Sequence, residues 1–223
     1  MKKTLLLLAL TLCGSGLLHA ETPANAPAEF PLTLADIRVR DPFILPEGGM
    51  YYLYAQGGNR ALNDNADLGV EVYKSRDLVH WSQPKQVFVR PKEGFWGKPP
   101  IWAPEVHKLD GAYYMFATFK GREAGMGSQI LRAESPEGPF VVVGDEANTP
   151  AEQTALDATP FIDPDGTHWM VYAHEWAQIQ DGTYLAVKMK NDWSARIGDP
   201  VLLFKASQGP WVRPHPRADT FVT

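Results

Sequence analysis

Three acidic side chains that lie close to repeated prolines are the residues whose types and spacing could do chemistry. Asp41 stands one residue before a proline, Asp157 stands three residues before another, and Glu105 directly follows a third. Carboxylates that converge suit paired acid–base work, in which one group protonates a leaving oxygen and another activates water. A single aspartate before a proline is more often part of an Asx turn. The recurrence at equivalent places favours catalytic roles for Asp41 and Asp157.

A repeated sequence pattern must position these acids. Each copy has a proline, a β-branched residue two positions later, a Gly/Asp turn and an aromatic-rich run that ends in alanine; the copies cover residues 40–55, 102–117 and 158–173. Their prolines lie 62 and then 56 residues apart. Aromatic and β-branched runs on both sides of such a turn indicate a β-hairpin. A hairpin that recurs at this interval is typical of the blades of a β-propeller.

The similarity between the copies continues beyond the hairpins, because an alternating strand follows each of them. We therefore predict an all-β fold, a partial propeller over residues 35–223 with about three blades and the start of a fourth in residues 201–223. A β-sandwich of unrelated hairpins is the alternative, since sandwiches also space their turns regularly. Propellers close with about four to eight blades, so we expect the chain to be truncated at its C-terminal side.

The innermost strands of a propeller begin around one mouth of its central channel. Asp41 and Asp157 are therefore predicted to meet there, although the equivalent position of the second copy is an alanine. His174 and Glu175 follow the third hairpin and are candidates for contact with a ligand or for a structural polar pair. Trp102 is a candidate platform for a sugar ring, because aromatic faces stack on sugars, with core packing as its alternative use.

The first 20 residues have the order of a signal peptide: two lysines, a short leucine-rich core and a small residue, Ala20, at the expected cleavage point. An Ala/Pro-rich leader follows at residues 21–34. We expect a secreted or periplasmic protein. Lipid anchoring at Cys13 is disfavoured because Leu12 occupies a place where a small residue is expected. Cys13 is the only cysteine, so the mature chain would have no disulfide.

The composition argues against several other classes of function. The net charge is −5, and without Lys/Arg clusters this disfavours nucleic acid and anionic membranes as partners. The six histidines show no zinc-binding spacing, and no Gly-x-Ser-x-Gly or phosphate-binding loop is present. His107 is expected to be structural. We predict no metal site among these residues and no required cofactor.

Three ordered segments carry a resemblance to a known family: residues 40–43 (Arg-Asp-Pro-Phe), 102–106 (Trp-Ala-Pro-Glu-Val) and 157–166 (Asp-Ala-Thr-Pro-Phe-Ile-Asp-Pro-Asp-Gly). They resemble successive signature segments of glycoside hydrolase family 43, five-bladed propeller enzymes that act on arabinan, xylan and related plant polysaccharides. The resemblance implies an exported, inverting glycosidase. It implies that Asp41 is the general base and that Asp157 orients the general acid and tunes its pKa.

The same resemblance implies that the general acid comes from a fourth blade. Residues 219–223 resemble the lead-in to that acid, so the fragment by itself is expected to be inactive. Trp102, Glu105, His174 and Glu175 are then expected to contact an oligo- or polysaccharide. The resemblance leaves open a structural calcium in the central channel. A carbohydrate-binding propeller without catalysis and a protein-interaction propeller remain as alternatives, and the sugar, the linkage and the oligomeric state stay open.

Overall fold

The computed structural model describes residues 29–56 and 69–212, and nearly all of their regular structure is β-strand. The predicted signal peptide (1–20), most of the leader and the segment 219–223 lie outside the described residues. In the described part of the chain no helix has both the length and the apolar character needed to cross a membrane.

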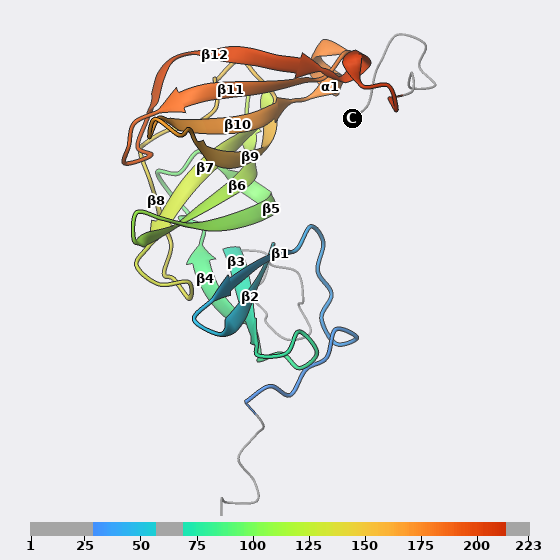
Figure 1. Cartoon of the computed structure of the whole chain (residues 1–223), viewed down its shortest axis with the longest axis vertical. Helices are drawn as coiled ribbons and strands as arrows, with labels where there is room; N and C mark the ends of the chain where they lie inside the picture. Colours follow the sequence, from blue (N-terminus) through green and yellow to red (C-terminus); the bar gives the residue numbers. More distant parts are fainter. Residues whose placement is uncertain (1–28, 57–68, 213–223) are drawn as a thin grey trace, which may run out of the picture.

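The strands form three sheets of four, and each sheet is a sequential antiparallel meander (Figure 1). The first contains β1 (Phe43–Glu47), β2 (Met50–Gln56), β3 (Gly69–Ser75) and β4 (Lys85–Val89). The second contains β5 (Lys98–Leu109), β6 (Ala112–Arg122), β7 (Gly125–Ala133) and β8 (Val141–Val142). The third contains β9 (Ala155–Ile162), β10 (His168–His174), β11 (Thr183–Met189) and β12 (Arg196–Lys205). These are three successive blades, as the repeats predict.

The tight turns of the first two inner hairpins follow from their central residues. Gly48 and Gly49 connect β1 to β2 with φ values of 58° and 76°, and Asp110 and Gly111 connect β5 to β6 with 49° and 82°. Two positive φ values in a two-residue loop match the twist of the flanking strands, and Gly and Asp tolerate that conformation. The third hairpin closes through a longer turn, in which the Asp163 N–H donates to the Thr167 carbonyl.

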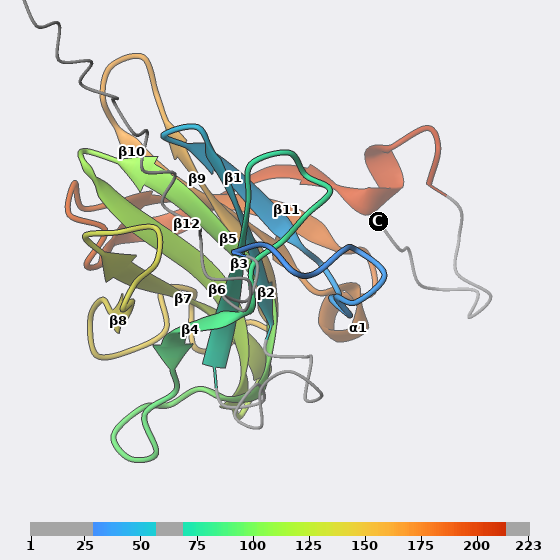
Figure 2. The same ribbon diagram turned by 90° about the horizontal axis from the view of Figure 1, so that it is seen from below.

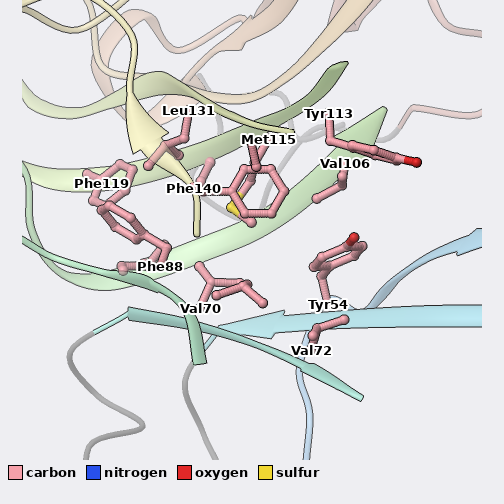
Figure 3. Packing of buried hydrophobic residues seen from close by; sticks show 14 residues of the cluster. Tyr54, Val70, Val72, Phe88, Val106, Tyr113, Met115, Phe119, Leu131 and Phe140 are labelled. Atoms are coloured by element: carbon pink, nitrogen blue, oxygen red, sulfur yellow. The ribbon is translucent and has the colours of Figure 1, made fainter. Parts of the chain in front are cut away.

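The blades pack face to face through two apolar clusters. One cluster joins the first and second blades, with Val70 and Phe88 on one side and Met115 and Leu131 on the other (Figure 3). The second cluster joins the second and third blades and includes the fully buried Trp193. Because each interface is a continuous apolar layer, burial of these side chains fixes the angle between neighbouring blades.

The innermost strands contact one another in sequence, β1 with β5 and β5 with β9, and Figure 1 shows β5 between the first hairpin and β9. Figure 2 shows the same blades from below. Within residues 29–56 and 69–212 the helical elements are short and lie on the third blade: α1 (Trp176–Ile179) and a 3₁₀ turn (Ala206–Gln208).

The last residues of β12 belong to a different blade from the one that the sequence predicts. Residues 201–205, which were expected to lead into a fourth unit, pair with β11 and complete the third blade. The alternation there is weak, because four consecutive apolar side chains from Val201 to Phe204 are each about half exposed (48%, 52%, 49% and 46%).

Candidate active site

A left-handed backbone conformation recurs at the inner strand of each described blade: just before β1, in the middle of β5 and near the start of β9. Asp41, Ala103 and Asp157 have φ values of 50°, 42° and 53°, a left-handed conformation that is costly for residues other than glycine and milder for aspartate. In β5 and β9 the residue lies in a β-bulge. Ala103 and its successor face one residue of β6, and Asp157 and its successor face one residue of β10. Bulges of this kind redirect side chains and are common beside functional sites.

The bulges place Asp157 at the position equivalent to Asp41. The residue that follows the left-handed position is Pro42 in the first blade, Pro104 in the second and Ala158 in the third. The sequence alignment instead matched Pro160 to the other two prolines, which is wrong by two residues. The longer turn of the third hairpin is the physical reason, since it changes the spacing between the strand head and the turn.

The structure brings Asp41, Glu105 and Glu175 into electrostatic range of Asp157. Partial burial raises the pKa of Asp157 above its ordinary value, and the negative charges of Asp41, Glu175 and Glu105 raise it further, in that order. Acids from all three described blades therefore lie around Asp157. A carboxyl that holds its proton more tightly than an ordinary aspartate does is a feature of sites that carry out acid–base chemistry.

One hydrogen bond from its backbone N–H holds Asp157 in the bulge. Its N–H donates to Thr118 Oγ1 at 3.0 Å, and Thr118, on β6, is only 1% exposed. Asp41 is exposed to solvent as well: its Oδ2 lies 3.5 Å from Arg40 Nε, with 48% of the aspartate side chain and 77% of the arginine side chain exposed. Such an exposed ion pair contributes little to stability.

Glu105 sits deeper, on β5. Its Oε1 accepts a hydrogen bond from Thr159 Oγ1 at 2.6 Å and also contacts His107 Nε2. Burial raises the pKa of Glu105, but the hydrogen bonds from His107 and Thr159 and the charge of His107 outweigh it, so that the pKa is lowered overall. Glu105 thus stays ionised where Asp157 is inclined to take up a proton.

A cavity of about 190 Å³ opens beside Asp157, with His174 and Glu175 in its wall. Trp176 and Tyr184 also line it. His174 Nε2 is 2.7 Å from Gln178 Oε1, and Glu175 caps α1.

Trp102 and a second hollow lie outside this cavity. Trp102 is partly buried, directly before Ala103, and is not part of the wall of that cavity. A larger hollow of about 590 Å³ lies between the β8–β9 connection and the β11–β12 turn. Because it contains none of the four acids, we place the site at the smaller cavity.

Sequence reasoning missed three contributors: Thr118, Thr159 and Tyr184. Only the period-two pattern of the inner strands could have pointed to Thr159, since nothing in the sequence pairs it with Glu105. In the described part of the chain no three His, Cys, Asp or Glu residues are grouped so that they could hold a metal ion.

Comparisons with known proteins bear on the family and the fold of the chain. The sequence model of the family described as Glycosyl hydrolases family 43 matches residues 34–217. The extracellular endo-α-(1→5)-L-arabinanase of Thermotoga petrophila is 31% identical over 170 residues, which cover 60% of this chain and 33% of that protein. An extracellular exo-α-(1→5)-L-arabinofuranosidase of Streptomyces avermitilis is 26% identical over 220 residues, or 88% of this chain and 43% of that protein.

Solved structures also share the fold of this chain. The endo-arabinase of Bacteroides thetaiotaomicron superposes with a TM-score of 0.74 at 37% identity, over 82% of this chain and 62% of that one. A thermostable family-43 glycoside hydrolase superposes with a TM-score of 0.62 at 27% identity, over 75% of this chain and 53% of that one. The chain spans between one third and one half of the length of the curated relatives described here.

Proposed function

Because the chain belongs to glycosyl hydrolases family 43, we propose that the whole protein that carries it hydrolyses glycosidic bonds in arabinan- or xylan-like polysaccharides. The observation that carries this proposal is that Asp41 and Asp157 share a left-handed backbone conformation near the starts of two inner strands. The charge of Asp41 also raises the pKa of Asp157. The names of the relatives favour α-1,5-linked arabinan among the candidate substrates.

The proposed reaction inverts the configuration of the anomeric carbon. Asp41 acts as the general base, which takes a proton from a water molecule as that water attacks the sugar. Its exposed carboxylate suits this role, because water can reach it. Asp157 acts beside it, orienting the group that protonates the leaving oxygen and tuning that group's pKa.

Substrate contacts are proposed for the residues around the cavity. His174 and Glu175 offer hydrogen bonds to sugar hydroxyls. Trp102 offers an aromatic face on β5, directly before Ala103. The protein is proposed to work outside the cytoplasm, in keeping with the extracellular relatives and with the predicted signal peptide at residues 1–20.

Kinetics of the whole protein test the proposal. Aryl α-L-arabinofuranosides, aryl xylosides and linear arabinan are supplied to wild type and to Asp41→Asn, and oligosaccharide binding is measured by calorimetry. We expect Asp41→Asn to lose nearly all turnover and to keep binding, since the water loses its base. Turnover within tenfold of wild type would exclude Asp41 as the base. Binding by wild type without any hydrolysis would favour a carbohydrate-binding propeller.

Asp110→Asn is the matched control. Asp110 is also an aspartate with a left-handed φ of 49°, but it lies in the turn at the other end of β5. Its substitution should leave turnover unchanged.

A further inference from the structure

A hydrogen-bonded cluster around Glu105 joins the second and third blades. Glu105 on β5 accepts from Thr159 on β9 at 2.6 Å, across 54 residues of sequence, and contacts His107 on its own strand. Glu105 and His107 are two residues apart on a strand, so their side chains leave the same face. Each of the two is only 29% exposed.

Aromatic packing fixes the histidine in this cluster. The His107 ring lies 5.3 Å from the Phe43 ring of β1 and 6.2 Å from the Phe116 ring of β6. Since these rings restrict the imidazole, its Nε2 is held toward Glu105. The cluster therefore touches the inner strand of every described blade.

The cluster also anchors the strand that carries Asp157. Thr159 follows Asp157 by two residues on β9 and is held by Glu105, while the N–H of Asp157 itself is held by Thr118. The β-bulge lies at Asp157 and Ala158, just before Thr159. One hydrogen bond to β6 therefore holds the chain within the bulge, and a second hydrogen bond to β5 holds it just after the bulge. We call this pair of hydrogen bonds the clamp.

We propose that Glu105, held by His107 and Thr159, is a positioning residue that fixes the orientation of the Asp157 carboxylate. This assignment replaces the direct contact with substrate that the sequence predicts for Glu105, because the Oε1 atom of Glu105 is already engaged by two partners. Its relevance to catalysis rests on the proposed function, whereas the clamp itself does not.

The charge of Glu105 adds a second effect on Asp157. The charged groups that act on Asp157 are Asp41, Glu175 and Glu105, and all three favour its protonated form. Because His107 and Thr159 lower the pKa of Glu105, this carboxylate stays negative while Asp157 titrates. Removal of that charge should make Asp157 easier to ionise.

Carboxyl titration by ¹³C NMR tests the charge effect without substrate. The side chain of Asp157 is assigned with Asp157→Asn, and its midpoint is compared in wild type, Glu105→Gln and Glu47→Gln. We expect Glu105→Gln to lower the Asp157 midpoint by a few tenths of a pH unit. Glu47→Gln, a glutamate at the far end of β1 that pairs with Lys108, should leave it unchanged. An unchanged midpoint in Glu105→Gln would overturn the charge effect.

Kinetics of the whole protein test the positioning. Thr159→Val removes the hydroxyl that binds Glu105 and keeps both carboxylates, and Thr159→Ser restores the hydroxyl. We expect Thr159→Val to lower kcat about tenfold to a hundredfold with little change in KM, and Thr159→Ser to recover most of it. If Glu105→Gln instead raises KM and leaves kcat unchanged, Glu105 contacts the substrate directly, and the positioning role is refuted. If wild type hydrolyses nothing, the proposed function fails, and the titration still decides whether Glu105 acts on Asp157.

If Glu105→Gln does not fold, the Thr159 series decides alone. Equal kcat in Thr159→Val and wild type would then refute the clamp, and a loss that serine recovers would support it.

Discussion

Asp157→Asn should stabilise the folded chain at neutral pH, although it removes a side chain proposed to be essential for function. Burial, together with the charges of Asp41, Glu175 and Glu105, raises the pKa of Asp157 above the ordinary value of 3.8. A carboxyl with a higher pKa in the folded chain binds its proton more tightly there, so stability falls as the pH rises from the unfolded to the folded pKa. Ionised Asp157 therefore costs stability at pH 7.

The magnitude of the gain follows from the size of the pKa difference. Each pH unit by which the folded pKa exceeds the unfolded one corresponds to about 1.4 kcal/mol. Asp157 remains partly exposed, and solvent screening reduces the effect, so we expect a gain below about 1 kcal/mol. Asparagine suits the exchange because it has a similar shape, tolerates the left-handed conformation at φ 53° and keeps the N–H that binds Thr118.

Urea unfolding at pH 7 and at pH 3.5 measures this gain. The Asn variant should have the higher midpoint at pH 7, and the difference should shrink markedly at pH 3.5, just below the ordinary pKa of 3.8, where wild-type Asp157 is mostly protonated in both states. Asp110→Asn, the left-handed aspartate at the other end of β5, serves as the control for the amide itself. A lower stability of Asp157→Asn at pH 7, or a gain of equal size at both pH values, would refute the electrostatic reasoning.

Three further outcomes are expected from the described contacts. Ala103→Gly should raise the unfolding free energy by up to about 1 kcal/mol in urea titrations, because glycine relieves the left-handed backbone at φ 42°; a loss of stability would mean that no strain is stored there. Thr118→Val should cost about 1–3 kcal/mol in the same assay, since the Asp157 N–H loses its acceptor; an unchanged midpoint would show that another group replaces the hydroxyl. The half-exposed apolar side chains of β12 should cause concentration-dependent association in sedimentation experiments, weakened by Leu202→Lys; a wild-type chain that stays monomeric at high concentration would count against this.

Features with local causes were predictable from the sequence. The turns at Gly48–Gly49 and Asp110–Gly111 need residues that accept positive φ, and the strands beside them alternate, so both hairpins could be located. Asp41 could be proposed because it directly precedes the inner strand of the first hairpin. The blade architecture followed because the same local signals recur three times.

Features that depend on contacts between blades were not predictable. Counted from the proline of each copy, Asp157 lies two residues farther away than Asp41 does. The β-bulge at Asp157 and the longer turn of the third hairpin change this spacing, and neither can be located from the sequence. The bond between Glu105 and Thr159 joins residues 54 apart in sequence, and neither residue carries a local signal for it. His107 was expected to be structural, which fits its packing but says nothing of its contact with Glu105.

Azide rescue of Asp41→Ala in the whole protein tests most directly whether Asp41 is the base that activates water. Removal of the carboxylate leaves space for a small anion on the face of the sugar that water would attack. With an aryl α-L-arabinofuranoside, the account predicts that azide restores turnover of the variant and that the product is the β-configured glycosyl azide. Absence of rescue, or a glycosyl azide with retained configuration, would contradict the role proposed for Asp41.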